Sequence, residues 1–296
     1  MVGRMIAARD LRKEYGDFVA VEGSTFDVDK GEVFGIVGPN GAGKTTTLKM
    51  IAGLLEPTGG TVEVAGYEAG ETEMQRRLGF LPEESPLYEE MTPLSYLDFF
   101  ADLYDVPGGV ATERIHDTLE RLDLEHRERP LGDMSKGMKR KVAIARSLVN
   151  DPDVLVYDEP ASGLDPLTTN YIIEFTQDLA EQGKTIVFSA HNLFHVESIC
   201  DRVAIMNEGA VVAQGGLDEL QAAHGETEYH VYTTVEVPGS VRENGRYHRV
   251  VETMDVVEGT REAARSAGGE VADIRTEESS LEEVFLNVAE SEAEGR

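Results

Sequence analysis

The spacing of hydrophobic residues predicts both strands and helices in the first 80 residues. Residues 18–28 alternate apolar and polar side chains, and residues 32–37 form a compact apolar run that ends at a glycine. Both patterns are typical of strands, as is the short run at residues 61–64. A helix is expected to start at Lys44, so this part of the chain combines sheet and helix.

The middle of the chain has the longer spacing of amphipathic helices. Residues 93–104 place apolar side chains three and four positions apart behind Thr92, which is suited to cap a helix, and residues 115–122 repeat the pattern. We therefore expect residues 84–150 to form a mostly helical inserted lobe. Two apolar runs beyond the lobe are typical of buried strands in a largely parallel sheet: 154–157 and 185–188.

The pattern changes near residue 222, where the polar segment QAAHGETEYH separates two strand-like stretches. We expect one domain over residues 1–221 and a small α+β domain over residues 222–296. The second domain is expected to contain strands at residues 230–237, 246–257 and 269–276, and helices at residues 260–267 and 280–288. The closing acidic residues 289–296 are expected to fray.

The composition is strongly acidic. The 296 residues include 27 Lys and Arg against 56 Asp and Glu, which gives a formal net charge of −29. This charge repels a phosphate backbone, so no nucleic-acid partner is expected. A solvated acidic surface explains the charge simply; adaptation to a salt-rich cytoplasm, where ions screen self-repulsion, is the more specific explanation that we favour.

Neither a disulfide nor a membrane span is expected. Cys200 is the single cysteine, and we expect it to be a small buried residue in a reducing compartment. The first ten residues reach charged side chains before any apolar stretch, so no signal peptide is expected. Since no run approaches the roughly 18 apolar residues of a spanning helix, any connection to a membrane should come through a partner.

The segment GPNGAGKTT follows a predicted strand and opens a predicted helix. That context distinguishes a phosphate-binding loop from an ordinary glycine turn. Gly38, Gly41 and Gly43 allow backbone N–H groups to turn toward phosphate. Lys44 adds a cation for the terminal phosphates, and Thr45 adds a hydroxyl for Mg²⁺.

Two acids follow the predicted buried strand VLVY. The strand places Asp158 and Glu159 at its carboxyl end, beside the phosphate loop. Asp158 would hold Mg²⁺ through water, and Glu159 would polarise the attacking water. An Asp-Glu pair also serves as a cap or turn after a strand, and the upstream phosphate loop favours the catalytic interpretation.

A second anion site is predicted at Ser135 and Gly137, directly before an apolar-periodic helix. A hydroxyl, backbone amides and a helix N-terminus would together attract phosphate there. A plain capped helix has the same pattern. If the segment does bind phosphate, one chain carries two half-sites.

Together these segments resemble the nucleotide-binding subunits of ABC transporters over residues 4–220. Five features follow that family's order and approximate spacing: the phosphate loop, SKGM, the Asp-Glu pair, the turn SGLD, and His191 in FSAHN. The resemblance implies an α/β P-loop NTPase fold. In that fold a RecA-like core carries an antiparallel β subdomain and an inserted helical subdomain.

The resemblance implies an ATPase that binds ATP and Mg²⁺ and works as a head-to-tail dimer, with a second copy or with a paralogue. Ser135 and Gly137 of one chain would contact the γ-phosphate held by Lys44 of the other. Nucleotide contacts are implied for Tyr15 on adenine, for Gly38, Asn40, Gly41, Gly43, Lys44, Thr45 and Thr46 on phosphates, and for Asp165 across the dimer. Catalytic roles are implied for Glu159 and His191, and metal contacts for Thr45, Asp158 and Glu83.

Some positions depart from the family pattern. Its signature usually reads Leu-Ser-Gly-Gly-Gln, whereas Met134, Lys136 and Met138 stand here, and Glu83 replaces a Gln that touches Mg²⁺ and responds to the permease. A carboxylate still binds Mg²⁺ but adds negative charge beside a triphosphate. With LPEE and the closing SSLEEVFLNV, these features resemble subunits that serve ABC-2 permeases. We therefore expect export through a separate integral-membrane permease, which contacts residues 83–88 and the helical lobe at the cytoplasmic face of the membrane.

Two other classes of protein share part of this pattern. A soluble ABC ATPase acting on DNA or ribosomes would carry the same motifs, but such proteins resemble long coiled coils or tandem cassettes, which this sequence does not. A GTPase or small-molecule kinase would explain the phosphate loop but not SKGM, and no Asn-Lys-x-Asp guanine reader is present. The sequence does not identify the cargo.

Overall fold

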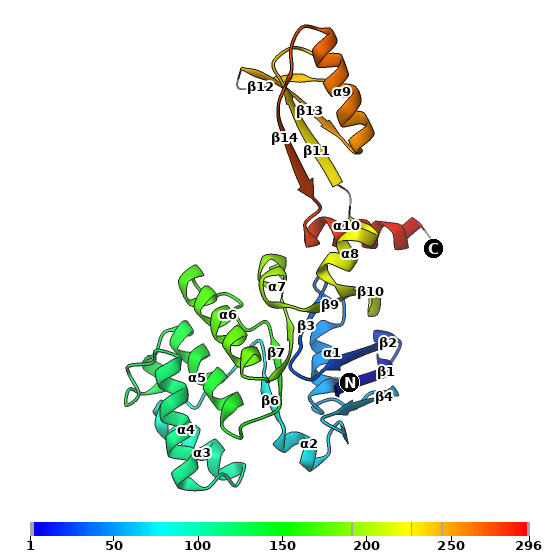
Figure 1. Ribbon diagram of the computed structural model, residues 1–296. Coiled ribbons are helices and arrows are strands. Elements are labelled where there is room, and N and C mark those ends of the chain that lie inside the picture. Colours follow the sequence, from blue (N-terminus) through cyan, green and yellow to red (C-terminus); the bar gives the residue numbers. More distant parts are fainter. Residues whose placement is uncertain (1–2, 191, 226, 244, 295–296) are drawn as a thin grey trace. The chain divides into compact units, whose positions relative to one another are not determined.

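The computed structural model of this protein divides into two compact units, Met1–Gly215 and Gly216–Arg296 (Figure 1). The residues that it describes are 3–190, 192–225, 227–243 and 245–294. The division lies before helix α8 (Leu217–His224), whereas the sequence pattern placed it near residue 222, inside that helix. The polarity change of the sequence marks the end of α8 rather than its start.

A six-stranded sheet, in the order β10-β9-β3-β8-β7-β6, forms the centre of the first unit (Figure 1). The strands are β3 Val33–Val37, β6 Leu78–Leu81, β7 Val154–Asp158, β8 Thr185–Ser189, β9 Arg202–Asn207 and β10 Ala210–Gly216. From β9 to β6 every neighbouring pair is parallel. Strands β3, β7 and β8 are buried along their whole length, which is why the sequence shows them as continuous apolar runs.

A second, antiparallel sheet has the order β2-β1-β4-β5. Its strands are β1 Arg4–Tyr15, β2 Phe18–Asp29, β4 Gly59–Val64 and β5 Tyr67–Glu68, and helix α1 spans Lys44–Ile51. The apolar faces of this sheet, of α1 and of the central sheet share one core, in which the rings of Phe26 and Phe34 stack at 5.5 Å. That core holds the loop between β3 and α1 in place.

The helical lobe lies where the sequence predicts it, within residues 84–150. It contains α3 Pro93–Leu103, α4 Gly108–Arg121, a 3₁₀ turn Leu131–Asp133 and α5 Lys136–Leu148. Thr92 caps α3 as expected, since its Oγ1 accepts a hydrogen bond of 3.3 Å from the N–H of Ser95. The helices outside the lobe are α2 Thr72–Arg76, α6 Pro166–Glu181 and α7 Leu193–Ile199. The α/β fold, the antiparallel sheet and the helical lobe are all confirmed.

The second unit is a small α+β fold with the sheet order β12-β13-β11-β14. Its elements are α8, β11 Thr227–Thr233, β12 Val241–Glu243, β13 Arg246–Val251, α9 Met254–Ser266, β14 Val271–Glu278 and α10 Leu281–Glu294. Val231, Val251 and Val257 form its core.

Two expectations for this unit are wrong. The strand predicted over residues 246–257 ends at Val251, and helix α9 starts at Met254 because Val257, Thr260 and Ala264 are buried at helical spacing. The acidic end is helical to Glu294 rather than frayed, since Ala and Glu favour helix.

Two further expectations concern the chain as a whole. Within the described ranges, none of the helices has the length and apolarity that a bilayer crossing requires. Cys200 is buried and forms no disulfide, as predicted, and its burial raises the pKa of the thiol.

Candidate nucleotide-binding and catalytic site

The phosphate loop connects β3 to α1 at the carboxyl end of the parallel strands. Gly38 and Gly43 have φ values of +153° and +97°. A Cβ atom would lie 2.2 Å from the carbonyl oxygen of Met206 at the first position and 2.6 Å from that of Ala20 at the second. Only glycine therefore fits at both positions. In this loop no side chain caps α1, which suits the helix N-terminus to an anion.

Lys44 is held inside this loop. Its side chain is buried, and Nζ donates hydrogen bonds to the carbonyl oxygens of Gly38 at 2.7 Å and Pro39 at 3.1 Å. Burial lowers the pKa of Lys44, while the carboxylates of Glu159, Asp158 and Glu83 act in the opposite direction. The lysine is thus positioned by the loop and faces negative charge.

Asp158 ends strand β7 and lies beside Thr45, the residue that follows the loop lysine. Its Oδ1 accepts hydrogen bonds from Thr45 Oγ1 at 3.2 Å and from Ser189 Oγ at 2.7 Å, and its side chain is almost fully buried. A carboxylate and a hydroxyl are the hard oxygen donors that Mg²⁺ prefers. In the described ranges no three His, Cys, Asp or Glu side chains converge to hold a metal by themselves.

Glu159 has an unusual backbone. Its φ of +48° is rare for a residue other than glycine and costs roughly 1–3 kcal/mol. Two contacts maintain it: the N–H of Glu159 donates to Ser189 Oγ at 3.1 Å, and its carbonyl oxygen accepts from Arg140 Nη2 at 2.8 Å. Strain of this kind persists where surrounding structure enforces it, and it is common at catalytic positions.

A cavity of about 230 Å³ surrounds the phosphate loop. The predicted residues that line it are Asn40, Gly41, Gly43, Lys44, Thr45, Thr46, Glu83 and Glu159. Phe18, which was not predicted, lines it too and is 64% exposed. Tyr15 pairs with Phe18 across the β1–β2 hairpin but is not among the lining residues; it is 51% exposed with Lys13 Nζ 5.4 Å from its ring centre. No local sequence pattern marked Phe18 as a lining residue, because its position depends on the β1–β2 hairpin.

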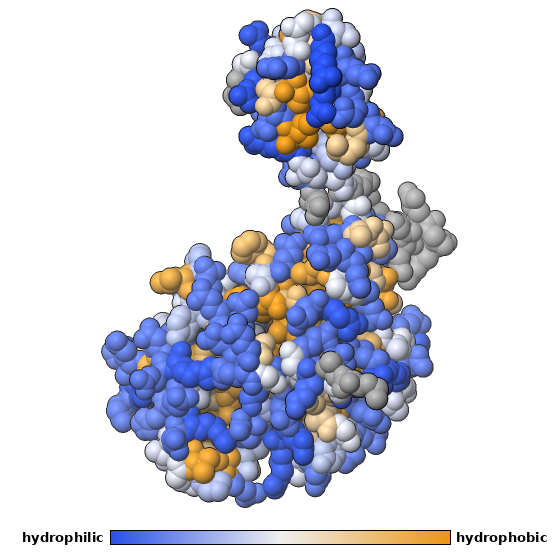
Figure 2. Space-filling view, viewed as in Figure 1, coloured by the Kyte–Doolittle hydropathy of each residue, from blue (hydrophilic) through white to orange (hydrophobic). Residues whose placement is uncertain are grey.

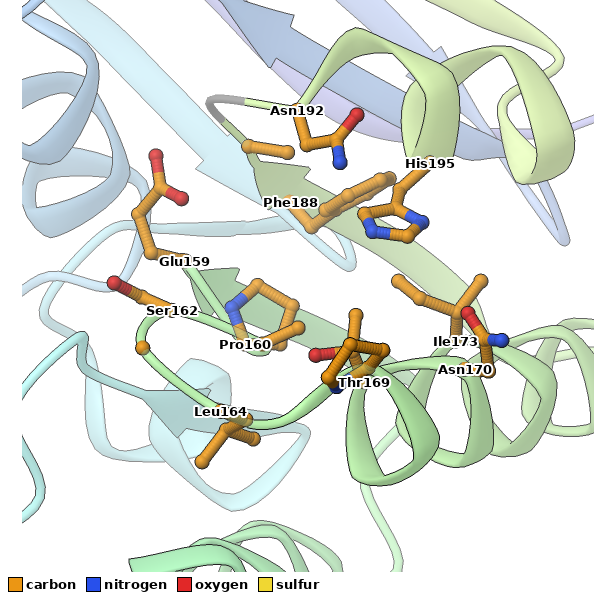
Figure 3. A pocket seen from close by; sticks show the side chains of 14 residues that line it. Glu159, Pro160, Ser162, Leu164, Thr169, Asn170, Ile173, Phe188, Asn192 and His195 are labelled. Atoms are coloured by element: carbon orange, nitrogen blue, oxygen red, sulfur yellow. The ribbon is translucent and has the colours of Figure 1, made fainter.

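Glu159 also borders a second cavity of about 470 Å³. Figure 3 shows Glu159 and Ser162 at one end of this cavity, and Asn170 and Ile173 of α6 at the other. His195 of α7 contributes to the wall between them. The catalytic candidate thus lies at the junction of two cavities.

The predicted second anion site lies elsewhere, at the start of α5. Ser135 caps this helix by accepting a hydrogen bond of 3.2 Å from the N–H of Met138. A Cβ atom at Gly137 would lie 3.1 Å from the side chain of Thr168 in α6, and one at Gly163 would lie 2.3 Å from Lys136 Nζ. The SKGM segment therefore packs against the SGLD turn.

Asp165 lies in this same group. Its carboxylate caps α6 by accepting hydrogen bonds from the N–H and the hydroxyl of Thr168, at 3.0 and 2.7 Å, and these bonds lower the pKa of Asp165. Ser135, Gly137 and Asp165 are absent from the described lining of the phosphate-loop cavity. His191 lies outside the described residues. The predicted site residues thus form two groups on one chain.

The fold and the phosphate loop define a P-loop nucleotide-binding domain, and comparison with known proteins specifies the family. The family described as "ABC transporter" matches residues 21–162. An uncharacterised ABC transporter ATP-binding protein of Nostoc sp. is 35% identical over 301 residues, which is 96% of this chain and 89% of that protein. This chain belongs to the ABC transporter ATP-binding proteins, which are ATPases.

Two further comparisons are informative. The Nod factor export ATP-binding protein I of Ralstonia nicotianae is 38% identical over 219 residues, which cover 73% of this chain and 68% of that protein. A solved dimeric ATP-binding cassette in a post-hydrolysis state, bound to ADP and Pi, has a TM-score of 0.66 and 26% identity and covers 72% of this chain and 99% of that chain. Relatives of this ATP-binding subunit thus include exporter subunits.

Proposed function

We propose that this ATPase subunit pairs head-to-tail with a second ATP-binding subunit and drives a separate ABC-2 type permease in export. ATP would close the pair, and hydrolysis and product release would reopen it. The subunit would act at the cytoplasmic face of the cell membrane, attached through the permease. The partner ATP-binding subunit would be a second copy of this chain or a paralogue.

The grouping of the site residues carries the proposal. The phosphate-loop cavity has Lys44 and Glu159, whereas Ser135 and Gly137 lie against α6. An exposed helix N-terminus such as that of α5 favours binding of an anion. A nucleotide phosphate bound by a second chain would supply that anion. The similar solved cassette is described as dimeric, which agrees with this arrangement.

Hydrolysis would use residues at the carboxyl end of β7. The oxygen donors of Thr45 and Asp158 suit Mg²⁺, which would neutralise charge on the phosphates, and Glu83 adds a carboxylate in the same cavity. Glu159 would polarise the attacking water from its strained backbone position. His191 is proposed to help fix that water. Tyr15 is proposed to stack on adenine.

The dimer and the role of Glu159 are tested together. Glu159→Gln should retain ATP binding, lose turnover and accumulate as a dimer with ATP and Mg²⁺, because phosphate contacts remain while water activation is lost. Size-exclusion chromatography with light scattering measures the dimer, and phosphate release measures turnover. Ser135→Arg on the Glu159→Gln background should bind ATP but stay monomeric. A monomeric Glu159→Gln variant that turns over at the wild-type rate would contradict the proposal.

Exposed apolar side chains on the helical lobe support the permease contact. Tyr88, Phe99 and Leu103 are 57%, 44% and 66% exposed, and the rings of Tyr88 and Phe99 lie 6.0 Å apart. Figure 2 shows apolar residues at the surface over α3. The Glu83 loop lies directly before Tyr88 in sequence, so a permease segment bound there would be linked to the nucleotide cavity.

Co-purification tests this contact. The full chain should co-purify in mild detergent with the membrane protein encoded in the adjacent reading frame. Phe99→Glu should reduce recovery of that protein without changing ATP turnover of the isolated subunit, whereas Val110→Glu, an exposed apolar residue on α4, serves as the matched control. Recovery of ribosomes or DNA instead of a membrane protein would favour the soluble ATPase class.

A further inference from the structure

Arg140 lies in the second turn of α5, is only 7% exposed and makes more side-chain hydrogen bonds than its neighbours on that helix. Its guanidinium donates hydrogen bonds to two segments. In residues 158–160, Nη2 donates to the carbonyl oxygens of Asp158 (3.1 Å) and Glu159 (2.8 Å), and Nε donates to that of Pro160 (2.7 Å). In residues 82–85, Nη1 donates to the carbonyl oxygens of Pro82 (2.7 Å) and Glu83 (2.9 Å) and to Ser85 Oγ (3.2 Å). One side chain thus joins three parts of the fold.

All six acceptors are uncharged carbonyl or hydroxyl oxygens. Burial therefore lowers the pKa of Arg140 to about 10, which leaves the guanidinium charged at neutral pH. The planar guanidinium has five N–H donors in a fixed arrangement and reaches both segments at once. Neither the ammonium of lysine nor the amide of glutamine can make this set of hydrogen bonds. The contacts are thus specific to arginine.

The joined segments carry the residues on which the proposed function depends. One segment contains Glu159, whose left-handed backbone is fixed by Arg140 at its carbonyl and by Ser189 at its N–H. The other contains Glu83, whose carboxylate lines the nucleotide cavity. Helix α5 itself starts at the Ser135 cap.

We propose that Arg140 is a positioning residue for ATP hydrolysis, which transmits the position of α5 to Glu159 and to the Glu83 loop. The inference rests on the proposed roles of Glu159 and of Ser135 with Gly137. When the first turn of α5 contacts the partner's nucleotide, Arg140 holds the Glu159 backbone in the orientation that aims its carboxylate at water. The rate of a catalysed step depends strongly on the position of the catalytic group, since a displacement of about 1 Å can lower the rate on the order of 100-fold.

The first test separates turnover from nucleotide affinity in the full chain. Arg140→Lys keeps the positive charge but loses most of the guanidinium hydrogen bonds. The kcat should therefore fall about 10- to 100-fold, while the KM and the dissociation constant for ATP stay within about threefold of the wild-type values. Arg114→Gln is the matched control, because Arg114 of the same lobe also donates to a backbone carbonyl, that of Val149. Its kcat should stay within about twofold of the wild type.

The second test asks whether Arg140 acts through Glu159. In single-turnover measurements, Arg140→Lys should produce no further loss when Glu159 is already Gln, because the two residues act as one unit. A further 10-fold loss in the double variant would overturn the inference.

The remaining outcomes distinguish the two proposals. If Glu159→Gln is inactive and Arg140→Lys is fully active, the positioning role fails and the proposed function stands. If Glu159→Gln turns over normally, the proposed function itself fails. If Arg140→Lys and Arg140→Gln lose ATP binding and melting temperature in step with turnover, Arg140 is a structural residue only and the inference is wrong.

Discussion

Replacing Ser189 by Ala would remove two buried hydrogen bonds at the catalytic edge. Ser189 is fully buried, donates to Asp158 Oδ1 at 2.7 Å and accepts from the N–H of Glu159 at 3.1 Å. A hydrogen bond to a charged group contributes about 1.5–3 kcal/mol, and a buried N–H without a partner costs about 1–3 kcal/mol. Allowing for partial relaxation, we expect Ser189→Ala to lower the free energy of unfolding by about 2–4 kcal/mol.

The measurement is urea unfolding followed by circular dichroism. Because the chain has two compact units, the relevant transition is the one that ATP with Mg²⁺ shifts to higher urea. Ser147→Ala is the control: this buried serine bonds only neutral groups, Ile144 O at 2.7 Å and Tyr157 Oη at 3.1 Å, so its loss should cost about 1–2 kcal/mol. A Ser189→Ala variant no less stable than Ser147→Ala would refute the reasoning.

Three further predictions concern charged groups. Lys44→Ala should weaken equilibrium ATP binding at least about 10-fold through loss of its cation, and an unchanged affinity by calorimetry would exclude that role. Lys184 lowers the pKa of Asp151 below its ordinary value of 3.8, so this ion pair stabilises the fold above that pH and loses its effect as the pH falls through the lowered value. Since Asp151 is 60% exposed, Asp151→Asn should cost less than about 1 kcal/mol at pH 7 and progressively less as the pH falls below 3.8, as thermal melts at a series of pH values would reveal. With a net charge of −29, the chain should lose thermal stability as KCl falls from molar levels, and melting curves that do not change with KCl would contradict the salt-adaptation hypothesis.

Continuous apolar runs and motifs with fixed spacing were the most predictable parts of the structure. Strands β7 and β8 are buried on both faces, so their sequences are apolar throughout, and the phosphate loop is recognisable because Gly38 and Gly43 exclude side chains. Strand β1 was not predicted because its pairing with β2 shifts register around Leu11 and Asp10 has a φ of +48°, which breaks the alternation.

Tertiary contacts account for the features that sequence alone could not supply. Arg140 belongs to the basic stretch MKRK, and its charge gave no sign that it is buried against carbonyl groups of two distant loops. Helix α6 was not predicted, although Asp165 as a cap and Pro166 at the first helical position are local signals for its start. Phe18 reaches the cavity through the hairpin geometry rather than through any local pattern.

The carbonyl oxygens of the phosphate loop compete with a bound phosphate for the N–H donors of Lys44. The ammonium has three N–H donors, and the carbonyl oxygens of Gly38 and Pro39 occupy two of them, so a phosphate can accept a hydrogen bond from the third and must displace a carbonyl for each further one. A nucleotide whose phosphate chain ends short of the lysine leaves those two bonds intact and forms no hydrogen bond of its own with the ammonium. Discrimination between long and short phosphate chains is therefore set partly by the loop's own backbone.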